Sequence, residues 1–159
     1  MALSSQLRQG TSVRIYLPAS KKIVAETALL TPEMGGQQTI LMVDDEDLLL
    51  TMGQTVLSAF GYQVLTANGG PKALELIVDR RAAIDLVITD LVMPQMSGRE
   101  LIEQIQLRLP GVPILCTSGF VRPGADAESE GYLPKPFTSQ ELLLRVKQLL
   151  EPIEGEAQP

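Results

Sequence analysis

The sequence predicts a doubly wound α/β fold, in which a five-stranded parallel sheet is sandwiched by helices. From Thr39 onward, short apolar runs alternate with longer amphipathic stretches. Most of the short runs are apolar at nearly every position, so a strand built from them needs cover on both faces, which helix layers on a parallel sheet provide. With 159 residues, 45% of them hydrophobic and 4% aromatic, the chain has enough material for one modest aliphatic core.

The first two strand–helix repeats lie between Thr39 and Arg81. The apolar run Thr39–Val43 predicts a buried strand, and a helix follows Glu46 and ends at Gly61. Its expected inward face is Leu49, Met52, Val56, Leu57 and Phe60. Tyr62–Thr66 predicts the second strand. The next helix is expected over 70–81, with the inward residues Ala73, Leu74, Ile77 and Val78.

Three further strands and two clear helices complete the pattern. The remaining strands are expected at Ile84–Thr89, Val112–Thr117 and Gly131–Leu133. The helices are expected at Ser97–Leu109, burying Leu101, Ile102 and Ile105, and at Ser139–Leu150, burying Leu142, Leu143, Val146 and Leu149. The segment between Thr117 and Gly131 contains Pro123-Gly124 and offers no apolar face, so the fourth helix of the fold is expected to be short or degenerate.

The two ends of the chain stand outside this alternation. Thr11–Leu17 alternates apolar and polar residues and predicts a strand without a partner in this chain. Residues 19–38 have the composition of a linker, and residues 152–159 form a polar tail. The repeating domain is therefore expected to occupy residues 39–151.

Charge and composition exclude several classes of function. A net charge of −6 disfavours nucleic acid and anionic membranes as partners, because both attract basic proteins. The sequence has no run of about 20 apolar residues and no signal-peptide pattern, so we expect a cytoplasmic location for this piece, whatever membrane attachment a parent protein has. The chain has no histidine, which excludes histidine-based catalysis and any phospho-histidine formed within it.

Polar side chains follow the predicted strands at one edge of the sheet. Asp44 and Asp45 follow the first strand, Asp90 the third and Ser118 the fourth, and Lys135 follows the fifth. In a doubly wound sheet this edge holds the functional crevice. Clustered carboxylates repel one another unless a cation lies between them. A site that offers only a small number of protein ligands suits Mg²⁺ better than Ca²⁺. The alternative is an acidic helix start that complements the helix dipole.

These motifs resemble the receiver domain of two-component response regulators, and the resemblance covers residues 39–150. It includes five short motifs in order, namely Asp44-Asp45-Glu46, Thr89-Asp90, Ser97-Gly98, Thr117-Ser118-Gly119 and Gly131-Tyr132-Leu133-Pro134-Lys135-Pro136. The resemblance implies a flavodoxin-like fold and a phosphoryl-accepting module of a phosphorelay. It further implies a cis peptide bond between Lys135 and Pro136.

The resemblance assigns the chemistry to particular residues. Asp90 would take a phosphoryl group from a phospho-histidine, while Mg²⁺ and Lys135 neutralise the phosphoryl oxygens. Asp45, Asp90 and the backbone carbonyl of Val92 would ligate the Mg²⁺ directly. Asp44 would act mainly through bound water.

Three more residues would govern the response to phosphorylation. Ser118 would bind the phosphoryl group and Tyr132 would swing inward as the switch, the alternatives being a turn hydroxyl and a fixed core aromatic. Val92 and Phe120 flank the path of the hydrolytic water. Because both are apolar, neither can orient a water molecule, and slow self-dephosphorylation is expected.

The N-terminal segment carries a second resemblance. Gly10-Thr11-Ser12-Val13-Arg14-Ile15-Tyr16-Leu17-Pro18 is similar to the last strand of the ATP-binding domain of sensor histidine kinases. Residues 1–18 would then be a remnant of that domain, and the chain the C-terminal receiver of a hybrid histidine kinase. The alternative is an unrelated extension that forms an edge strand.

Several functions remain in competition. The expected partners are a histidine kinase, in cis or in trans, and a histidine phosphotransfer protein. The alternatives are a stand-alone single-domain regulator or phosphate sink, and a Mg²⁺-dependent phosphatase with an aspartyl nucleophile. Such phosphatases place a second aspartate where Val92 stands, which counts against the last option. No ATP-binding residues are recognised, so we expect no stand-alone enzyme.

Overall fold

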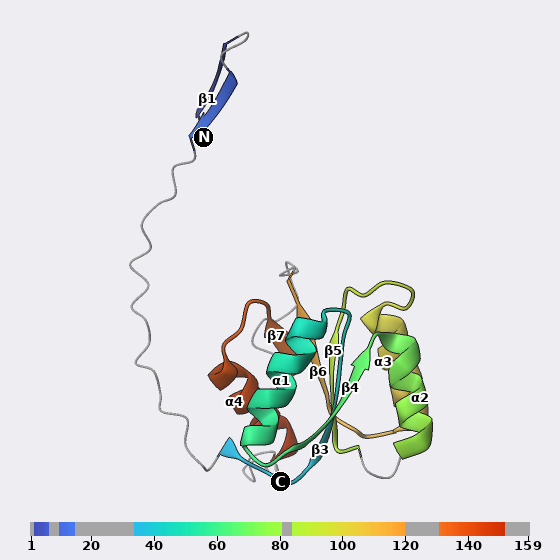
Figure 1. The fold of residues 1–159 in the computed structure, drawn as a ribbon. Coiled ribbons are helices and arrows are strands. Elements are labelled where there is room, and N and C mark those ends of the chain that lie inside the picture. Colours follow the sequence, from blue (N-terminus) through green and yellow to red (C-terminus); the bar gives the residue numbers. More distant parts are fainter. Residues whose placement is uncertain (1, 7–9, 15–33, 81–83, 120–130, 152–159) are drawn as a thin grey trace, which may run out of the picture.

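Five parallel strands form the central sheet (Figure 1). The computed structural model describes residues 2–6, 10–14, 34–80, 84–119 and 131–151. The strands of the sheet are β3 (Thr39–Asp44), β4 (Gln63–Asn68), β5 (Leu86–Asp90), β6 (Ile114–Ser118) and β7 (Tyr132–Pro134). Their order is β4-β3-β5-β6-β7 and every neighbouring pair is parallel. The predicted doubly wound sheet is confirmed.

In the part of the chain that the structure describes, two helices cover each face of the sheet (Figure 1). Helices α1 (Asp47–Ala59) and α4 (Ser139–Leu150) pack on one face, and α2 (Gly70–Arg80) and α3 (Gly98–Arg108) pack on the other. Strands β3 and β5 lie inside the sheet and therefore need apolar residues on both faces.

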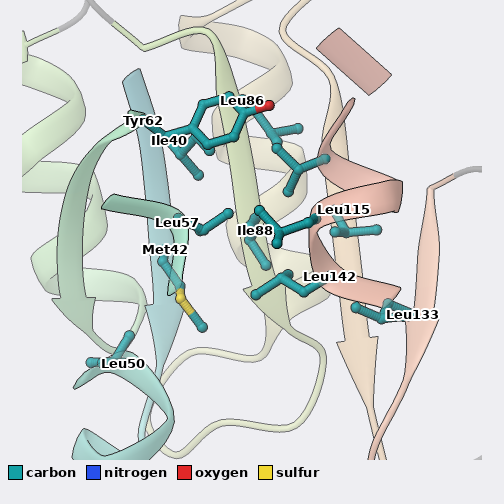
Figure 2. Close-up of a cluster of buried hydrophobic side chains, with 12 residues drawn as sticks. Ile40, Met42, Leu50, Leu57, Tyr62, Leu86, Ile88, Leu115, Leu133 and Leu142 are labelled. Carbon is teal, nitrogen blue, oxygen red and sulfur yellow. The ribbon is translucent and has the colours of Figure 1, made fainter. Parts of the chain in front are cut away.

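Alternate residues of β3 feed two separate cores. Ile40 and Met42 join the cluster under α1 and α4, which Figure 2 shows, whereas Leu41 and Val43 join the cluster under α2 and α3. This division follows from the period of two along a strand. It explains why the run is apolar at every position, and it fixes the register that brings Asp44 to the end of the strand.

The inward face of α1 differs from the prediction. Its buried residues are Leu50, Gly53 and Leu57, whereas Met52 is 55% exposed. Gly53 lies directly against the thioether of Met42 of β3, so a Cβ at position 53 would force the Met42 side chain to shift. The helix approaches the sheet through this glycine, which carries no hydrophobic signal in the sequence, and the prediction for Met52 was wrong for that reason.

The other helices agree with the prediction except at Val78 of α2, which is exposed, and at Ile102 of α3, which is only half-buried and belongs to neither core cluster. Val78 is 71% exposed, because α2 buries Ala73 and Ile77 and packs Leu74 and Leu76 against the core, which leaves position 78 on the outer side. Helices α3 and α4 begin with capping boxes, formed by Ser97 with Glu100 and by Thr138 with Glu141. Both bury the expected residues Leu101, Ile105, Leu142, Leu143 and Val146.

The N-terminal strand has a partner. Strand β1 (Ala2–Gln6) pairs antiparallel with β2 (Gly10–Arg14), and the two form a sheet of their own. The prediction of an unpaired strand was wrong because the segment of β1 has no apolar alternation that would indicate a strand. The expected fourth helix and Phe120 fall within residues 120–130, outside the described residues. Among the described helices, none has the length and apolar character needed to span a bilayer.

Candidate functional site

Three carboxylates meet at the carboxyl edge of the sheet. Asp44 ends β3, Asp45 follows it, and Asp90 ends the neighbouring strand β5. Carboxylate oxygens of all three lie within 4.8 Å of one another. Asp44 and Asp90 are buried, at 2% and 7% exposure, whereas Asp45 is exposed. The parallel register places these residues together as the sequence pattern predicts.

Lys135 binds two of the carboxylates. Its Nζ donates hydrogen bonds to Asp44 Oδ2 at 2.8 Å and to Asp90 Oδ2 at 2.6 Å. Burial lowers the pKa of Lys135, but the hydrogen bonds to Asp44 and Asp90 outweigh it, so the net shift raises this pKa above its ordinary value of 10.5. Lys135 is therefore a cation at neutral pH. One lysine against three carboxylates leaves the cluster with excess negative charge.

The backbone holds Lys135 beside Ser118. The N–H of Lys135 donates to the carbonyl of Ser118 at 2.9 Å, which extends the pairing of β6 with β7 by one residue. Ser118 is 3% exposed at the end of β6. The peptide bond between Lys135 and Pro136 is cis, as expected. Strands β5, β6 and β7 are consecutive in the sheet, so Asp90, Ser118 and Lys135 lie along one edge.

Backbone hydrogen bonds fix the loop after Asp90. The N–H of Val92 donates to Asp90 Oδ1 at 3.0 Å and orients the carboxylate. The N–H of Leu91 donates to the carbonyl of Thr117 at 2.9 Å, and the N–H of Gly98 donates to the carbonyl of Leu91 at 3.2 Å. Residue patterns gave no indication of the hydrogen bonds of Leu91, because a contact made by backbone atoms leaves no signature in residue type.

The start of α1 is tied to the same edge. Asp44 Oδ1 accepts a hydrogen bond from the N–H of Glu46 at 2.9 Å, so both oxygens of this carboxylate have donors. In the first turn of α1, Asp47 Oδ1 accepts a hydrogen bond from Asn68 Nδ2 at 2.5 Å, which joins the helix to the end of β4. The acidic residues are thus more than a helix start, because Asp44 points into the cluster and Asp47 away from it.

The remaining predicted residues surround this centre. Tyr132 is half-buried at the start of β7, in register with Cys116 of β6. Val92 is 59% exposed, and Phe120 lies outside the described residues. Beside the cluster is an open depression of about 350 Å³ lined by Glu46, Leu49, Lys135, Pro136 and Phe137.

The donor set fits a hard divalent cation. Asp44, Asp45 and Asp90 offer only carboxylate oxygens, the ligands that Mg²⁺ prefers, and no nitrogen or sulfur ligand is found in this cluster. Two of the carboxylates are buried, where excess negative charge is costly. A cation beside Asp45, on the exposed side of the cluster, would relieve that repulsion.

Comparison with known proteins agrees with this geometry. The model of the response regulator receiver domain family matches residues 40–147. The chain belongs to the response regulator receiver domain family. The matched range includes β5, which ends at Asp90, and the acidic cluster together with Ser118 and Lys135.

Two curated relatives place this receiver domain in different protein contexts. Sensor kinase CckA of Brucella abortus (strain 2308) is 32% identical over 166 aligned residues, which cover 92% of this chain and 17% of that protein. Response regulator MprA of Mycobacterium sp. (strain KMS) is 37% identical over 128 residues, covering 76% of this chain and 55% of that protein. The chain therefore spans only part of each relative.

Solved receiver structures share the fold. The receiver domain from the hybrid histidine kinase CckA is 36% identical, with a TM-score of 0.62 and coverage of 71% of this chain and 99% of that chain. The chemotaxis protein CheY4 of Vibrio cholerae is 29% identical, with a TM-score of 0.65 and coverage of 72% and 100%. In both comparisons the covered share of this chain is close to the share that the receiver domain occupies.

Proposed function

We propose that this receiver domain accepts a phosphoryl group on Asp90 from a phospho-histidine of a partner. The observation that carries the proposal is the buried Asp90 carboxylate, which lies 2.6 Å from Lys135 Nζ at the end of β5, within a cluster of three carboxylates. A buried carboxylate held between a fixed cation and further acidic oxygens is suited to nucleophilic attack on phosphorus. Residues 1–159 include no histidine, so the donor would lie on a separate kinase or on the kinase region of a longer parent chain.

The proposed step is an in-line transfer. An oxygen of Asp90 forms a bond to phosphorus, the bond between phosphorus and the donor imidazole nitrogen breaks, and its electron pair stays with the imidazole. The product is an acyl phosphate on Asp90 and a free histidine on the donor. Lys135 faces the phosphoryl oxygens, and the N–H of Val92 holds the Asp90 carboxylate in place.

Mg²⁺ is the proposed cofactor. Asp45, Asp90 and the backbone carbonyl of Val92 would hold it directly, with Asp44 acting through water. The bound cation would supply positive charge next to the transferred phosphoryl group. The all-oxygen donor set and the excess negative charge support this assignment.

Ser118 and Tyr132 are the proposed switch. Ser118 lies one hydrogen bond from Lys135 along the same edge, so its hydroxyl is placed to bind a phosphoryl group on Asp90. Tyr132 is half-buried, which leaves its ring room to move further inward. When Ser118 binds the phosphoryl group, the Tyr132 ring would move into the space that the Ser118 side chain leaves. This movement would couple the phosphorylation of Asp90 to the surface around β7.

The wider organisation is proposed from the curated match. We assign residues 1–18 to a remnant of a kinase ATP-binding domain, 19–38 to a linker, 39–151 to the receiver and 152–159 to a tail. The match to Sensor kinase CckA covers 92% of this chain, far more than residues 40–147, so it includes residues before the receiver. This coverage supports a hybrid histidine kinase as the parent protein, with the receiver in the cytoplasm and a histidine phosphotransfer protein as the downstream partner.

Mass spectrometry after incubation with acetyl phosphate and Mg²⁺ tests the function. The wild type should gain one phosphoryl adduct, Asp90→Ala should gain none, and the exposed Asp79→Asn should behave as the wild type. An equal adduct on Asp90→Ala would refute the assignment. A phosphatase would instead release phosphate continuously without accumulating an adduct, so the same samples distinguish the two classes.

A further inference from the structure

The last residues before the receiver are bound to the edge of the sheet opposite the acidic cluster (Figure 1). The hydroxyl of Tyr62 donates a hydrogen bond to the carbonyl of Met34 at 3.1 Å, and the N–H of Gly36 donates to the carbonyl of Phe60 at 3.0 Å. Met34 also packs, partly buried, against the core cluster under α1 and α4. Residues 34–38 are therefore anchored before β3 begins.

Two glycines allow this close contact. A Cβ at Gly36 would come within 2.5 Å of Cε1 of the Tyr62 ring. Gly61 has a φ of +92°, and a Cβ there would lie 2.6 Å from the carbonyl oxygen of Gly36. Each glycine is needed because the other segment lies against it. A linker that served only as a spacer would not require such a fit.

Tyr62 makes the contact specific. Its ring is 4% exposed and lies at the end of the core cluster nearest the start of β3, as Figure 2 shows. Burial, together with the nearby carboxylate of Glu151, raises the pKa of Tyr62 above its ordinary value of 10.0. The hydroxyl therefore stays protonated over the physiological range, and it donates to Met34 throughout.

We propose that Met34, Gly36, Phe60, Gly61 and Tyr62 form a clasp that fixes the point at which the receiver is tethered. The tether point then lies at the edge opposite Asp90, which leaves the phosphorylation site facing away from the chain's own connection. Releasing the five residues 34–38 would extend the tether by at most about 18 Å. In the hybrid kinase of the proposed function, on which this role depends, a longer tether lowers the effective concentration of Asp90 at a donor in the same chain.

Hydrogen exchange in the full chain tests the clasp. The amide at position 36 should be protected in the wild type and should exchange roughly tenfold faster in Tyr62→Phe and in Gly36→Ala, after correction for the intrinsic exchange rate of each residue type. The Leu41 amide of β3 should keep its protection, which shows that the fold is intact. The control is Gln63→Ala, which changes an exposed side chain next to Tyr62. An unprotected Gly36 amide in the wild type, or protection unchanged in both variants, would overturn the clasp.

A distance measurement tests the tether role. Spin labels at Ala25→Cys and Asp79→Cys, in a Cys116→Ser background, report the separation between the upstream chain and α2. The distribution should widen toward longer distances in Gly36→Ala, and an unchanged distribution would overturn the role. Labelling of Asp90 by acetyl phosphate, measured on Tyr62→Phe, should equal that of the wild type. Failure of the clasp with normal labelling leaves the proposed function intact. Loss of labelling in the wild type refutes the function and the tether role that rests on it, whereas protection of the Gly36 amide still tests the clasp itself.

Discussion

Gly98, the first residue of α3, lies directly against the backbone of Asp90. A Cβ at Gly98 would approach the Cα of Leu91 to 2.7 Å and the carbonyl carbon of Asp90 to 2.9 Å. The N–H of Gly98 also donates to the carbonyl of Leu91. Because these neighbours are backbone atoms, they cannot turn aside as a flexible side chain could. The start of α3 therefore determines where the carboxylate of Asp90 stands.

Gly98→Ala should displace Asp90. The added methyl group overpacks a backbone contact, so we expect a loss of about 1–3 kcal/mol in the free energy of unfolding, measured in urea. Phosphorylation by acetyl phosphate should slow, since Asp90 would move relative to Lys135. Arg99→Ala, at the exposed next position, should leave both measurements unchanged. Wild-type stability in Gly98→Ala would show that the loop can yield at no cost.

Lys135→Met should destabilise the protein by leaving two buried carboxylates without their cation. Removal of one partner from a buried ion pair costs about 3–5 kcal/mol in the free energy of unfolding. In an Asp90→Asn background the loss should be smaller, because one of the two carboxylates is then neutral. Urea unfolding of the four proteins measures the coupling. Equal losses in both backgrounds would contradict a direct interaction of Lys135 with Asp90.

The stability difference between the wild type and Lys135→Met should depend on pH. The pKa of Lys135 is raised in the folded state, so its contribution is complete below the unfolded pKa and is lost as the pH rises through the higher folded value. The difference in unfolding free energy between the wild type and Lys135→Met should be flat from about pH 6 to 9. It should shrink only above the ordinary lysine pKa of 10.5. A decline that began near neutral pH would contradict the raised pKa.

Residue patterns predicted the sheet and the acidic edge because both depend on side-chain type. Asp44, Asp90 and Lys135 come together because parallel strands end at one edge of the sheet, and the ends of the strands can be located from the apolar runs in the sequence. Features that depend on the lack of a side chain at a glycine, or on backbone atoms, could not be predicted from the sequence. Gly53 reverses the expected burial of Met52 without any apolar signal of its own. The hydrogen bonds of Leu91 and the pairing partner β1 likewise leave no pattern in residue type.

Mg²⁺ should stabilise the wild type against unfolding. The cation relieves repulsion within the carboxylate cluster, so it binds the folded chain in preference to the unfolded one. At a tenfold excess over its dissociation constant it should add about 1.4 kcal/mol to the free energy of unfolding. Asp45→Asn removes the exposed ligand and should abolish most of this gain, whereas Asp79→Asn should retain it. Equal stabilisation of both variants would place the cation elsewhere.

Val92 should make the acyl phosphate of Asp90 long-lived. Its side chain is 59% exposed beside Asp90, and its isopropyl group has no atom that can hold a water molecule for attack on phosphorus. We expect the acyl phosphate to have a half-life of minutes or longer in Mg²⁺, measured as the loss of the phosphoryl adduct in mass spectra. Val92→Asn provides an amide that can orient water and should shorten the half-life roughly tenfold. Val78→Asn, at a valine of α2 that is also exposed, controls for the polar substitution itself. A half-life of seconds in the wild type would show that residues other than Val92 position the hydrolytic water.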